Sequence, residues 1–221
     1  MIDSSYIALI VVTLVIGMGA SGYVKQQLSK YSKVPMSKGI TGAEAARRML
    51  QYYGINDVVV KRGHAGQDFY DPRTRSITLD PDAFDGTSIT ATATACHEAG
   101  HAFQHAQDYL PMKVRSAIVP AVNLASNTWM FLFFAGLASN LVGLQTAAIV
   151  MYGIAVVFQF VTLPVEFNAS KRAMTYLSET GVLQSEQSGA WSVLRACALT
   201  YVAGALTSIL QLLWLLGRRD D

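Results

Sequence analysis

Charged residues and cysteines are scarce in this chain of 221 residues. Asp, Glu, Lys and Arg make up 14% of it, against about 25% in soluble domains. The two cysteines, Cys96 and Cys197, exclude a disulfide framework. We interpret both as small buried thiols, with a metal-binding role for Cys96 as the minor alternative. No Lys/Arg tract exists and the net charge is only +2, which argues against a nucleic-acid partner. Apolar residues reach 52%, which indicates a chain solvated partly by lipid.

Four apolar stretches are each long enough to cross a bilayer, which takes about 20 helical residues. They are residues 6–24, 117–137, 141–163 and 196–216. We interpret the first as a retained anchor and not as a cleaved signal peptide, because only Asp3 is charged before it. A short turn at Ser139 and Asn140 joins the second and third stretches into a helical hairpin.

One face of the second stretch is polar. Asn123, Ser126 and Asn127 share it at helical spacing. Polar groups are costly in lipid, so we expect this face to turn toward neighbouring helices. Packing between helices is preferred here to a path for substrate.

Positive charge flanking the stretches predicts the orientation of the chain. The residues on one side of a four-span arrangement are Lys25, Lys30, Lys33, Lys38, Lys113, Arg115, Lys171 and Arg172. The soluble part is therefore expected in the cytoplasm, with the amino terminus outside, in a multi-pass protein of the plasma membrane. Arg218 and Arg219 disagree, since four crossings place them outside. Either the last stretch does not cross fully or the rule is outweighed.

The soluble segment between the first two stretches has the pattern of a small α+β unit. Thr41 and Glu44 form a capping box, and the helix that they open is expected to end at Gly54. Residues 57–61 are expected to form a strand.

A β-hairpin and a second helix follow. Residues 69–70 and 76–79 flank a turn that contains Pro72. Residues 76–79 form either an edge strand that an extended peptide can join or an ordinary hairpin strand. The helix is expected to start near Thr87 or Ser88 and to continue to about Asp108.

The second helix carries the pattern HEAGH. His97 and His101 are four residues apart, so on a helix both imidazoles reach one Zn²⁺ at about 2.0–2.1 Å. Glu98 can act as general base, taking the proton of a zinc-activated water as it attacks a carbonyl. Gly100 weakens the helix, which is tolerable where another helix or the substrate comes close. The alternative is a pair of core histidines satisfied by hydrogen bonds.

A catalytic zinc takes three protein ligands and one open position. His105 continues the spacing, but it lies about 12 Å from His97 along an unbroken helix, too far to share a metal. It is expected on the helix surface or in support of the site. His64 is a weaker loop candidate.

Glu166 is the best candidate for the third ligand. It follows Pro164 at the end of the third stretch, where an unpaired carboxylate beside hydrocarbon is costly. Pro164 suits the first turn of a new helix, on which Glu166 and Ser170 would share a face. The alternative is an interfacial glutamate paired with Lys171 or Arg172.

Several segments together form a more specific pattern than HEAGH alone. They are residues 70–72, 77–79, 97–104, 109–111 and 163–172, with Arg115 and Pro120. This pattern runs over nearly the whole chain and resembles the YugP-type neutral zinc metallopeptidases. It is more distantly similar to the HtpX-type membrane zincins. The resemblance implies a zinc-dependent membrane peptidase.

The resemblance also implies roles for single residues. It implies three zinc ligands, His97, His101 and Glu166, and a catalytic carboxylate, Glu98. Ser170 stands where the HtpX-type proteins have an Asp, and it brings no charge. Phe69 stands where many members of the YugP-type family are expected to have a histidine.

We therefore expect a mainly α-helical membrane protein with about four transmembrane helices and a small α+β, zincin-like cytoplasmic domain that carries the HExxH helix. The expected segments are an amino-terminal anchor (1–24), the soluble domain (25–116), a transmembrane hairpin (117–163), a cytoplasmic helical segment with the third ligand (164–195), and a carboxy-terminal transmembrane helix and tail (196–221).

The expected function is that of a zinc metalloendopeptidase acting near the cytoplasmic membrane surface on peptides or membrane proteins. The bilayer is the other expected partner, and the oligomeric state stays open. The sequence does not choose an oxyanion donor among Arg172, Lys171, His105, Tyr70 and Asn168. The alternative is a non-catalytic, zinc-stabilised membrane adaptor or scaffold, with His105 or Cys96 as a fourth ligand that closes the site.

Overall fold

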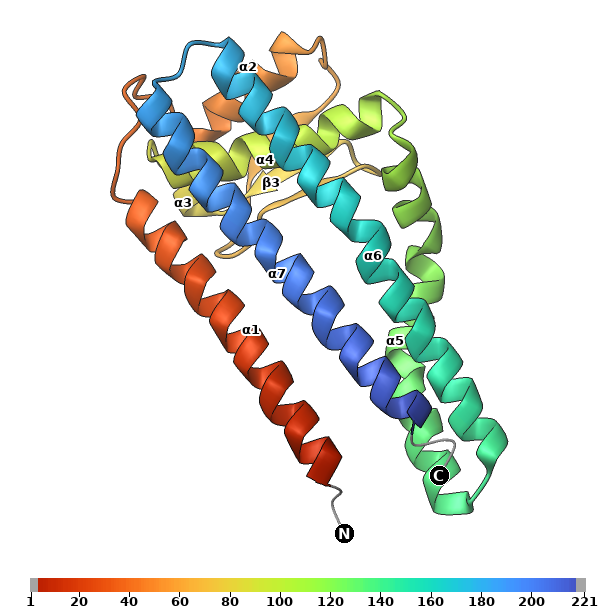
Figure 1. Cartoon of the computed structure of the whole chain (residues 1–221). Coiled ribbons are helices and arrows are strands. Elements are labelled where there is room, and N and C mark those ends of the chain that lie inside the picture. Colours follow the sequence, from red (N-terminus) through yellow and green to blue (C-terminus); the bar gives the residue numbers. More distant parts are fainter. Residues whose placement is uncertain (1–3, 218–221) are drawn as a thin grey trace.

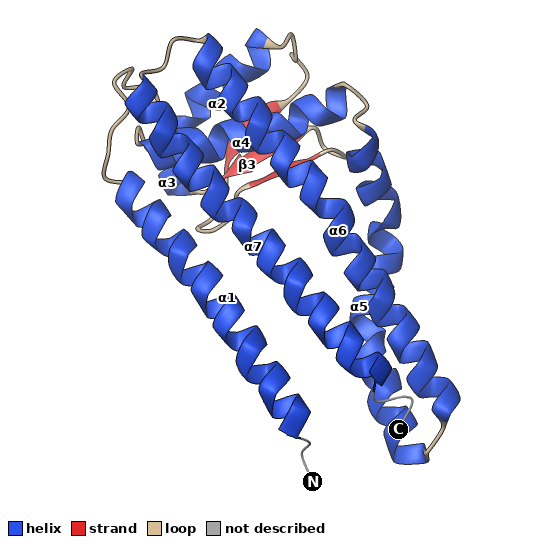
Figure 2. Cartoon of the chain, viewed as in Figure 1, coloured by secondary structure: helices blue, strands red, loops and turns tan. Residues whose placement is uncertain are grey.

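The structure is a computed structural model that describes residues 4–217, and it is mainly helical (Figures 1 and 2). Within these residues, four helices are long and apolar enough to cross a membrane. They are α1 (Ser4–Tyr31), α5 (Leu110–Ser139), α6 (Val142–Glu179) and α7 (Gln184–Gly217). The expected number of membrane-length apolar helices is confirmed, although each helix is longer than its apolar stretch. Arg218 and Arg219 lie outside the described residues.

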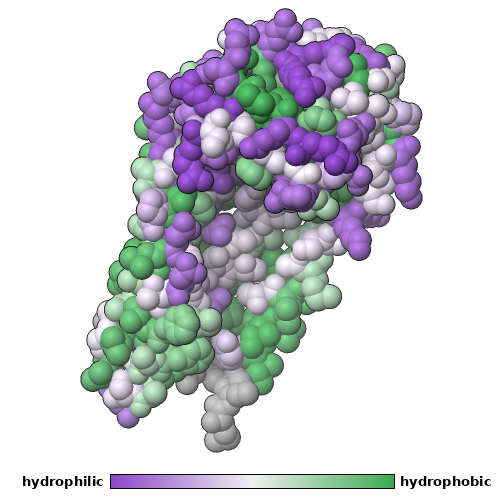
Figure 3. Space-filling model, turned by 180° about the vertical axis from the view of Figure 1, so that it is seen from behind, coloured by the Kyte–Doolittle hydropathy of each residue, from purple (hydrophilic) through white to green (hydrophobic). Residues whose placement is uncertain are grey.

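The four long helices form a row below a compact domain (Figure 1). Helix α7 packs against α1 and α6, and α6 also packs against α5. Helices α1 and α5 are therefore the two ends of the row. In Figure 3 the domain is largely hydrophilic and the projecting helices are largely hydrophobic.

Helix α6 does not begin anew at Pro164, so that prediction was wrong. The helix is continuous from Val142 to Glu179, with Pro164 inside it. Because proline has no N–H, the carbonyl four residues earlier loses its hydrogen bond within the helix. Helix α6 nevertheless stays continuous, because it packs against α5 and α7. As a result, Glu166 is fixed to the same rigid helix as the third span.

The soluble region contains a three-stranded sheet of β1 (Val59–Arg62), β2 (Phe69–Asp71) and β3 (Ser76–Leu79), in the order β1-β3-β2. Strands β2 and β3 form the predicted antiparallel hairpin, and β1 runs parallel to β3. The alternative in which residues 76–79 form an open edge is wrong. Strand β3 is paired on both sides and all four of its residues are buried, so β1 and β2 are the edges.

Three helices pack against this sheet: α2 (Gly42–Tyr52), α3 (Pro81–Asp85) and α4 (Ile89–Ala106). The predicted helix starts are confirmed, because Thr41 accepts a hydrogen bond from the backbone of Glu44, and Ser88 caps α4. The Glu44 carboxylate accepts from Arg48 and so does not complete the capping box. Helix α3 was not expected; Asp80 caps it and Pro81 occupies its first turn.

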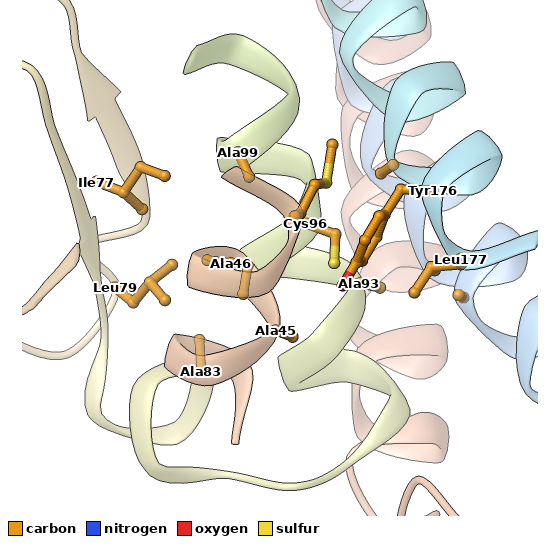
Figure 4. Packing of buried hydrophobic residues seen from close by; sticks show 14 of the residues in the cluster. Ala45, Ala46, Ile77, Leu79, Ala83, Ala93, Cys96, Ala99, Tyr176 and Leu177 are labelled. Carbon is orange, nitrogen blue, oxygen red and sulfur yellow. The ribbon is translucent and has the colours of Figure 1, made fainter. Parts of the chain in front are cut away.

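Helix α4 lies at the centre of the core (Figure 4). Its alanines, including Ala93 and Ala99, face α2 and the central strand on one side and the end of α6 on the other. Small side chains allow helices to pack closely. The core therefore holds α4 and α6 in a fixed relation, on which the site below depends.

The polar face of α5 does not turn toward neighbouring helices as expected. Asn123, Ser126 and Asn127 are exposed within the described chain. The reason is the position of α5 at the end of the row, where its main partner is α6.

Candidate metal centre and cavity

Two histidines of α4 and a glutamate of α6 meet where the two helices cross. One ligand atom each from His97, His101 and Glu166 lie within 4.8 Å of one another. The Nε2 atom of His97 is 3.2 Å, and that of His101 3.6 Å, from Oε2 of Glu166. Two imidazole nitrogens and a carboxylate oxygen are a donor set that zinc takes in catalytic sites. The arrangement fits a zinc ion, and the ligand roles stay a prediction.

Gly100 makes this meeting possible. A Cβ atom at this position would lie 2.6 Å from the carbonyl oxygen of Ala169 on α6. Since real Cβ atoms do not approach backbone oxygen so closely, a side chain would push the helices apart. The glycine inside HEAGH therefore serves the close approach of another helix, one of the two reasons expected for it.

Each imidazole also has a hydrogen-bond partner at Nδ1, its second ring nitrogen. Nδ1 of His97 lies 3.2 Å from the hydroxyl oxygen of Ser170, and Nδ1 of His101 lies 3.0 Å from Oε1 of Gln104. The Gln104 amide donates to the carbonyl of Val165 at 2.7 Å. Such contacts fix the ring orientation of a ligand histidine. Ser170 thus hydrogen-bonds without supplying a charge.

A cavity of about 640 Å³ opens onto these side chains. It is lined by residues of β2, α4, α5, α6 and α7, among them His97, Glu98, His101, Glu166 and Tyr201. Glu98 is 7% exposed. The cavity therefore brings the proposed base and the three candidate ligands to one space that a substrate can enter.

Charge in the cavity is mixed. Nη1 of Arg115 lies 3.9 Å from Oε1 of Glu166, and its Nε atom has no hydrogen-bond partner within residues 4–217. Burial lowers the pKa of His101, but its hydrogen bond to Glu166 and the charges of Glu98 and Glu166 outweigh that effect and raise the pKa overall. Burial also raises the pKa of Asp68, at the rim of the cavity, to about 6.

The other predicted metal candidates lie away from this group. His105 is bonded through Nδ1 to the hydroxyl of Tyr70 at 2.8 Å, and burial raises the pKa of Tyr70 to about 12. His64 is exposed in a loop. Cys96 is a fully buried thiol of the core (Figure 4), where burial raises its pKa to about 12. Cys197 is half-buried and free.

Of the five candidate oxyanion donors, only Tyr70 lines the cavity. Arg172 donates to Asn168 and Gln107 and lies over the ring of Phe103. Both Arg172 and Asn168 thereby brace the junction of α4 and α6 instead of facing a substrate. Lys171 is exposed and outside the cavity lining.

Sequence reasoning missed three residues of this region. Gln104 follows His101 by one helical turn, and that spacing is a signal for its support of the ligand. Arg115 carries a signal as well, because it is a cation at the start of an apolar span. Asp68 has no sequence signal, since its place at the cavity depends on the hairpin.

Comparison with known proteins shows the family of the chain. The family described as "Putative neutral zinc metallopeptidase" matches residues 6–219. The chain is also 44% identical over 211 residues to the "Putative membrane protease YugP" of Bacillus subtilis (strain 168), covering 94% of this chain and 93% of that protein. No solved structure matches the chain. The chain therefore belongs to the neutral zinc metallopeptidase family.

Proposed function

We propose that this protein is a zinc-dependent membrane endopeptidase in which His97, His101 and Glu166 hold the zinc ion and Glu98 is the general base. One observation carries the proposal. The buried Glu98 carboxylate lines the same cavity as the three clustered ligand side chains. A metal that only braced a fold would need no such cavity beside it.

The chemistry divides between the metal and the chain. When bound, zinc supplies a Lewis acid that polarises the scissile carbonyl and makes the attacking water more acidic. Glu98 accepts a proton from the attacking water and delivers it to the leaving amine. Its burial favours this proton transfer, because little bulk water competes at a carboxylate that is 7% exposed.

One side chain of the cavity is suited to stabilise the developing oxyanion. Arg115 presents a guanidinium beside Glu166, whereas the hydroxyl of Tyr70 is bonded to His105. Donors that are already oriented, in a site that excludes water, stabilise transition-state charge strongly.

Strand β2 is suited to align the substrate. It is an edge strand, and all three of its residues, Phe69–Asp71, line the cavity. An extended peptide can pair with such an edge through backbone hydrogen bonds. We therefore assign to β2 the peptide-binding role that was considered for residues 76–79, because those residues form the central strand of the sheet.

The place of cleavage follows from the cavity walls. These walls come from the α+β region, which we interpret as a zincin-like domain of about residues 25–116, and from α5, α6 and α7. We infer that cleavage takes place near the cytoplasmic surface of the plasma membrane. The Lys and Arg residues beside the spans support that orientation. The proposal keeps the expected division of the rest of the chain. The segments are the amino-terminal anchor (1–24), the transmembrane hairpin (117–163), the cytoplasmic helical segment (164–195), and the carboxy-terminal transmembrane helix and tail (196–221).

The test compares purified wild type with Glu98→Gln and His97→Ala, each with zinc or with chelator, on an unstructured protein substrate. We expect Glu98→Gln to keep zinc but lose cleavage, and His97→Ala to lose both. Full activity in zinc-loaded Glu98→Gln would refute the mechanism.

The second candidate function is a zinc-stabilised adaptor or scaffold without catalysis. It requires a fourth protein ligand, for which His105 and Cys96 were the candidates. Within residues 4–217 neither belongs to the metal-binding group. Zinc-loaded wild type that cleaves no peptide, with a fourth protein ligand on the metal, would favour this function.

A further inference from the structure

The cavity continues from the metal centre along α5, away from the domain. The residues of α5 that line it are Met112, Arg115, Ser116, Val119, Pro120 and Asn123. They recur every three or four residues and so form one face of the helix. Seen from behind, the molecule has a hollow between two hydrophobic arms beneath the hydrophilic domain (Figure 3).

Polar side chains extend this face beyond the cavity. Asn123 lines the cavity, and Ser126 and Asn127 follow it on the same face, all three exposed. Within the described chain no residue hydrogen-bonds to these side chains. Asn127 lies about 18 Å from Arg115 along the helix axis. This separation is smaller than the thickness of the hydrocarbon layer, which is about 30 Å. With Arg115 at the membrane surface, Asn127 therefore lies inside the layer.

Pro120 adds a backbone acceptor to the same face. It has no N–H, so the carbonyl of Ser116, four residues earlier, loses its hydrogen bond within the helix. Both residues line the cavity. The face therefore presents amide, hydroxyl and carbonyl groups, although α5 otherwise has the composition of a membrane span.

Such a face requires a polar occupant. An unpaired amide in hydrocarbon costs several kcal/mol, and lipid chains offer it no partner. A polypeptide that is unwound for cleavage has the complementary problem, because its freed N–H and C=O groups must also be satisfied in the membrane. Asn side chains both donate and accept, and so does Ser.

We propose that this face of α5, from Arg115 to Asn127, binds the unwound end of a substrate's transmembrane segment and leads it to the metal centre. The proposal rests on the peptidase function above and defines its substrate as a membrane-anchored protein. A second copy of the chain could also cover these groups. The substrate is favoured because the face is continuous with the cavity that contains Glu98.

The first experiment uses two reporters in proteoliposomes, one unstructured cleavable sequence that is either free or joined to a single transmembrane helix. Asn127→Leu is expected to lower kcat/KM for the anchored reporter by about 10-fold, the worth of one hydrogen bond at a site without water. Cleavage of the free reporter stays unchanged. The matched control is Thr128→Val, because the Thr128 hydroxyl bonds within its own helix to Leu124 and not to a substrate.

Equal slowing of both reporters, or of neither, would overturn the proposal. A second readout does not depend on cleavage. A photoreactive residue is placed at Ser126, or at Thr146 on α6 as control, in Glu98→Gln protein with the anchored reporter. A cross-link to the reporter from position 126 alone is the expected result.

Two other results are informative. A cross-link from position 126 to a second copy of the chain would identify a dimer face and reject the substrate path. A cross-link to the reporter without any zinc-dependent cleavage by wild type would support the path and refute the peptidase function. The experiment therefore distinguishes a failure of the proposed substrate path from a failure of the proposed peptidase function.

Discussion

Helices α4 and α1 differ in how they are stabilised. In α4, 12 of the 18 residues are buried, whereas none of the 28 residues of α1 is. Helix α4 packs against α2, α6, α7 and the sheet, while α1 meets little more than α7. The candidate metal site is located where packing is dense, because ligands held to fractions of an ångström need rigid support. The membrane half depends more on lipid.

The largest expected effect comes from Glu166→Ala, which removes the one candidate ligand contributed by α6. Zinc affinity is expected to fall by more than about 100-fold, the upper range for residues that only support a ligand. Competition with a fluorescent chelator measures it. Glu179→Ala, a change at the end of the same helix, is the control and should keep full affinity. Tight zinc binding by Glu166→Ala would show that α4 suffices.

A smaller loss is expected from Gln104→Ala. This change leaves Nδ1 of His101 without its partner and removes a bond between α4 and α6. We expect about 10- to 100-fold weaker zinc binding with the secondary structure intact. Gln51→Ala, at an exposed position of α2, is the control. An unchanged affinity for Gln104→Ala would mean that packing alone orients the ring.

Gly100→Ala in α4 and Gly17→Ala in α1 compare the packing around the two helices. The new methyl group at position 100 meets a backbone oxygen of α6, whereas around Gly17 no atom lies within 4 Å. Overpacking of this kind costs about 1–3 kcal/mol. Thermal unfolding in detergent should show a lower Tm for Gly100→Ala and no loss for Gly17→Ala. Equal Tm values for the two variants would contradict the claim that α4 is more densely packed than α1.

The smallest effect concerns Asp68, whose pKa burial raises to about 6 in the folded protein. A raised pKa means that folding favours the protonated carboxyl. The contribution of Asp68 to the stability of the metal-free protein should therefore be complete below about pH 4 and be lost as the pH rises through about 6. Because Asp68 is partly exposed, solvent screening limits the change to about 1 kcal/mol. Asp68→Asn should abolish this part of the pH dependence, and a persistent slope would assign it elsewhere.

Features that depend on local spacing were predictable from the sequence. The caps at Thr41 and Ser88, the hairpin around Pro72 and the four apolar helices each follow from a few neighbouring residues. The pairing of His97 with His101 depends only on helix periodicity. Glu166 was singled out as a candidate because a lone carboxylate beside hydrocarbon needs a partner, and the structure places it beside the two histidines.

Features that depend on distant packing were not predictable. Pro164 reads locally as a helix start, and only the neighbouring helices keep α6 continuous through it. Strand β3 is central because β1 pairs with it across the intervening hairpin. The exposure of Asn127 follows from the terminal place of α5 in the row. Gly100 had an ambiguous purpose until its neighbour Ala169 was known.

The central claim is that α4 and α6 together hold one zinc ion with an open position. X-ray absorption spectroscopy of the zinc-loaded full-length protein tests it most directly. The account predicts two imidazole nitrogens and oxygen ligands, without sulfur, and the loss of this spectrum in Glu166→Ala. A sulfur ligand, a third imidazole or an unchanged spectrum in Glu166→Ala would contradict it.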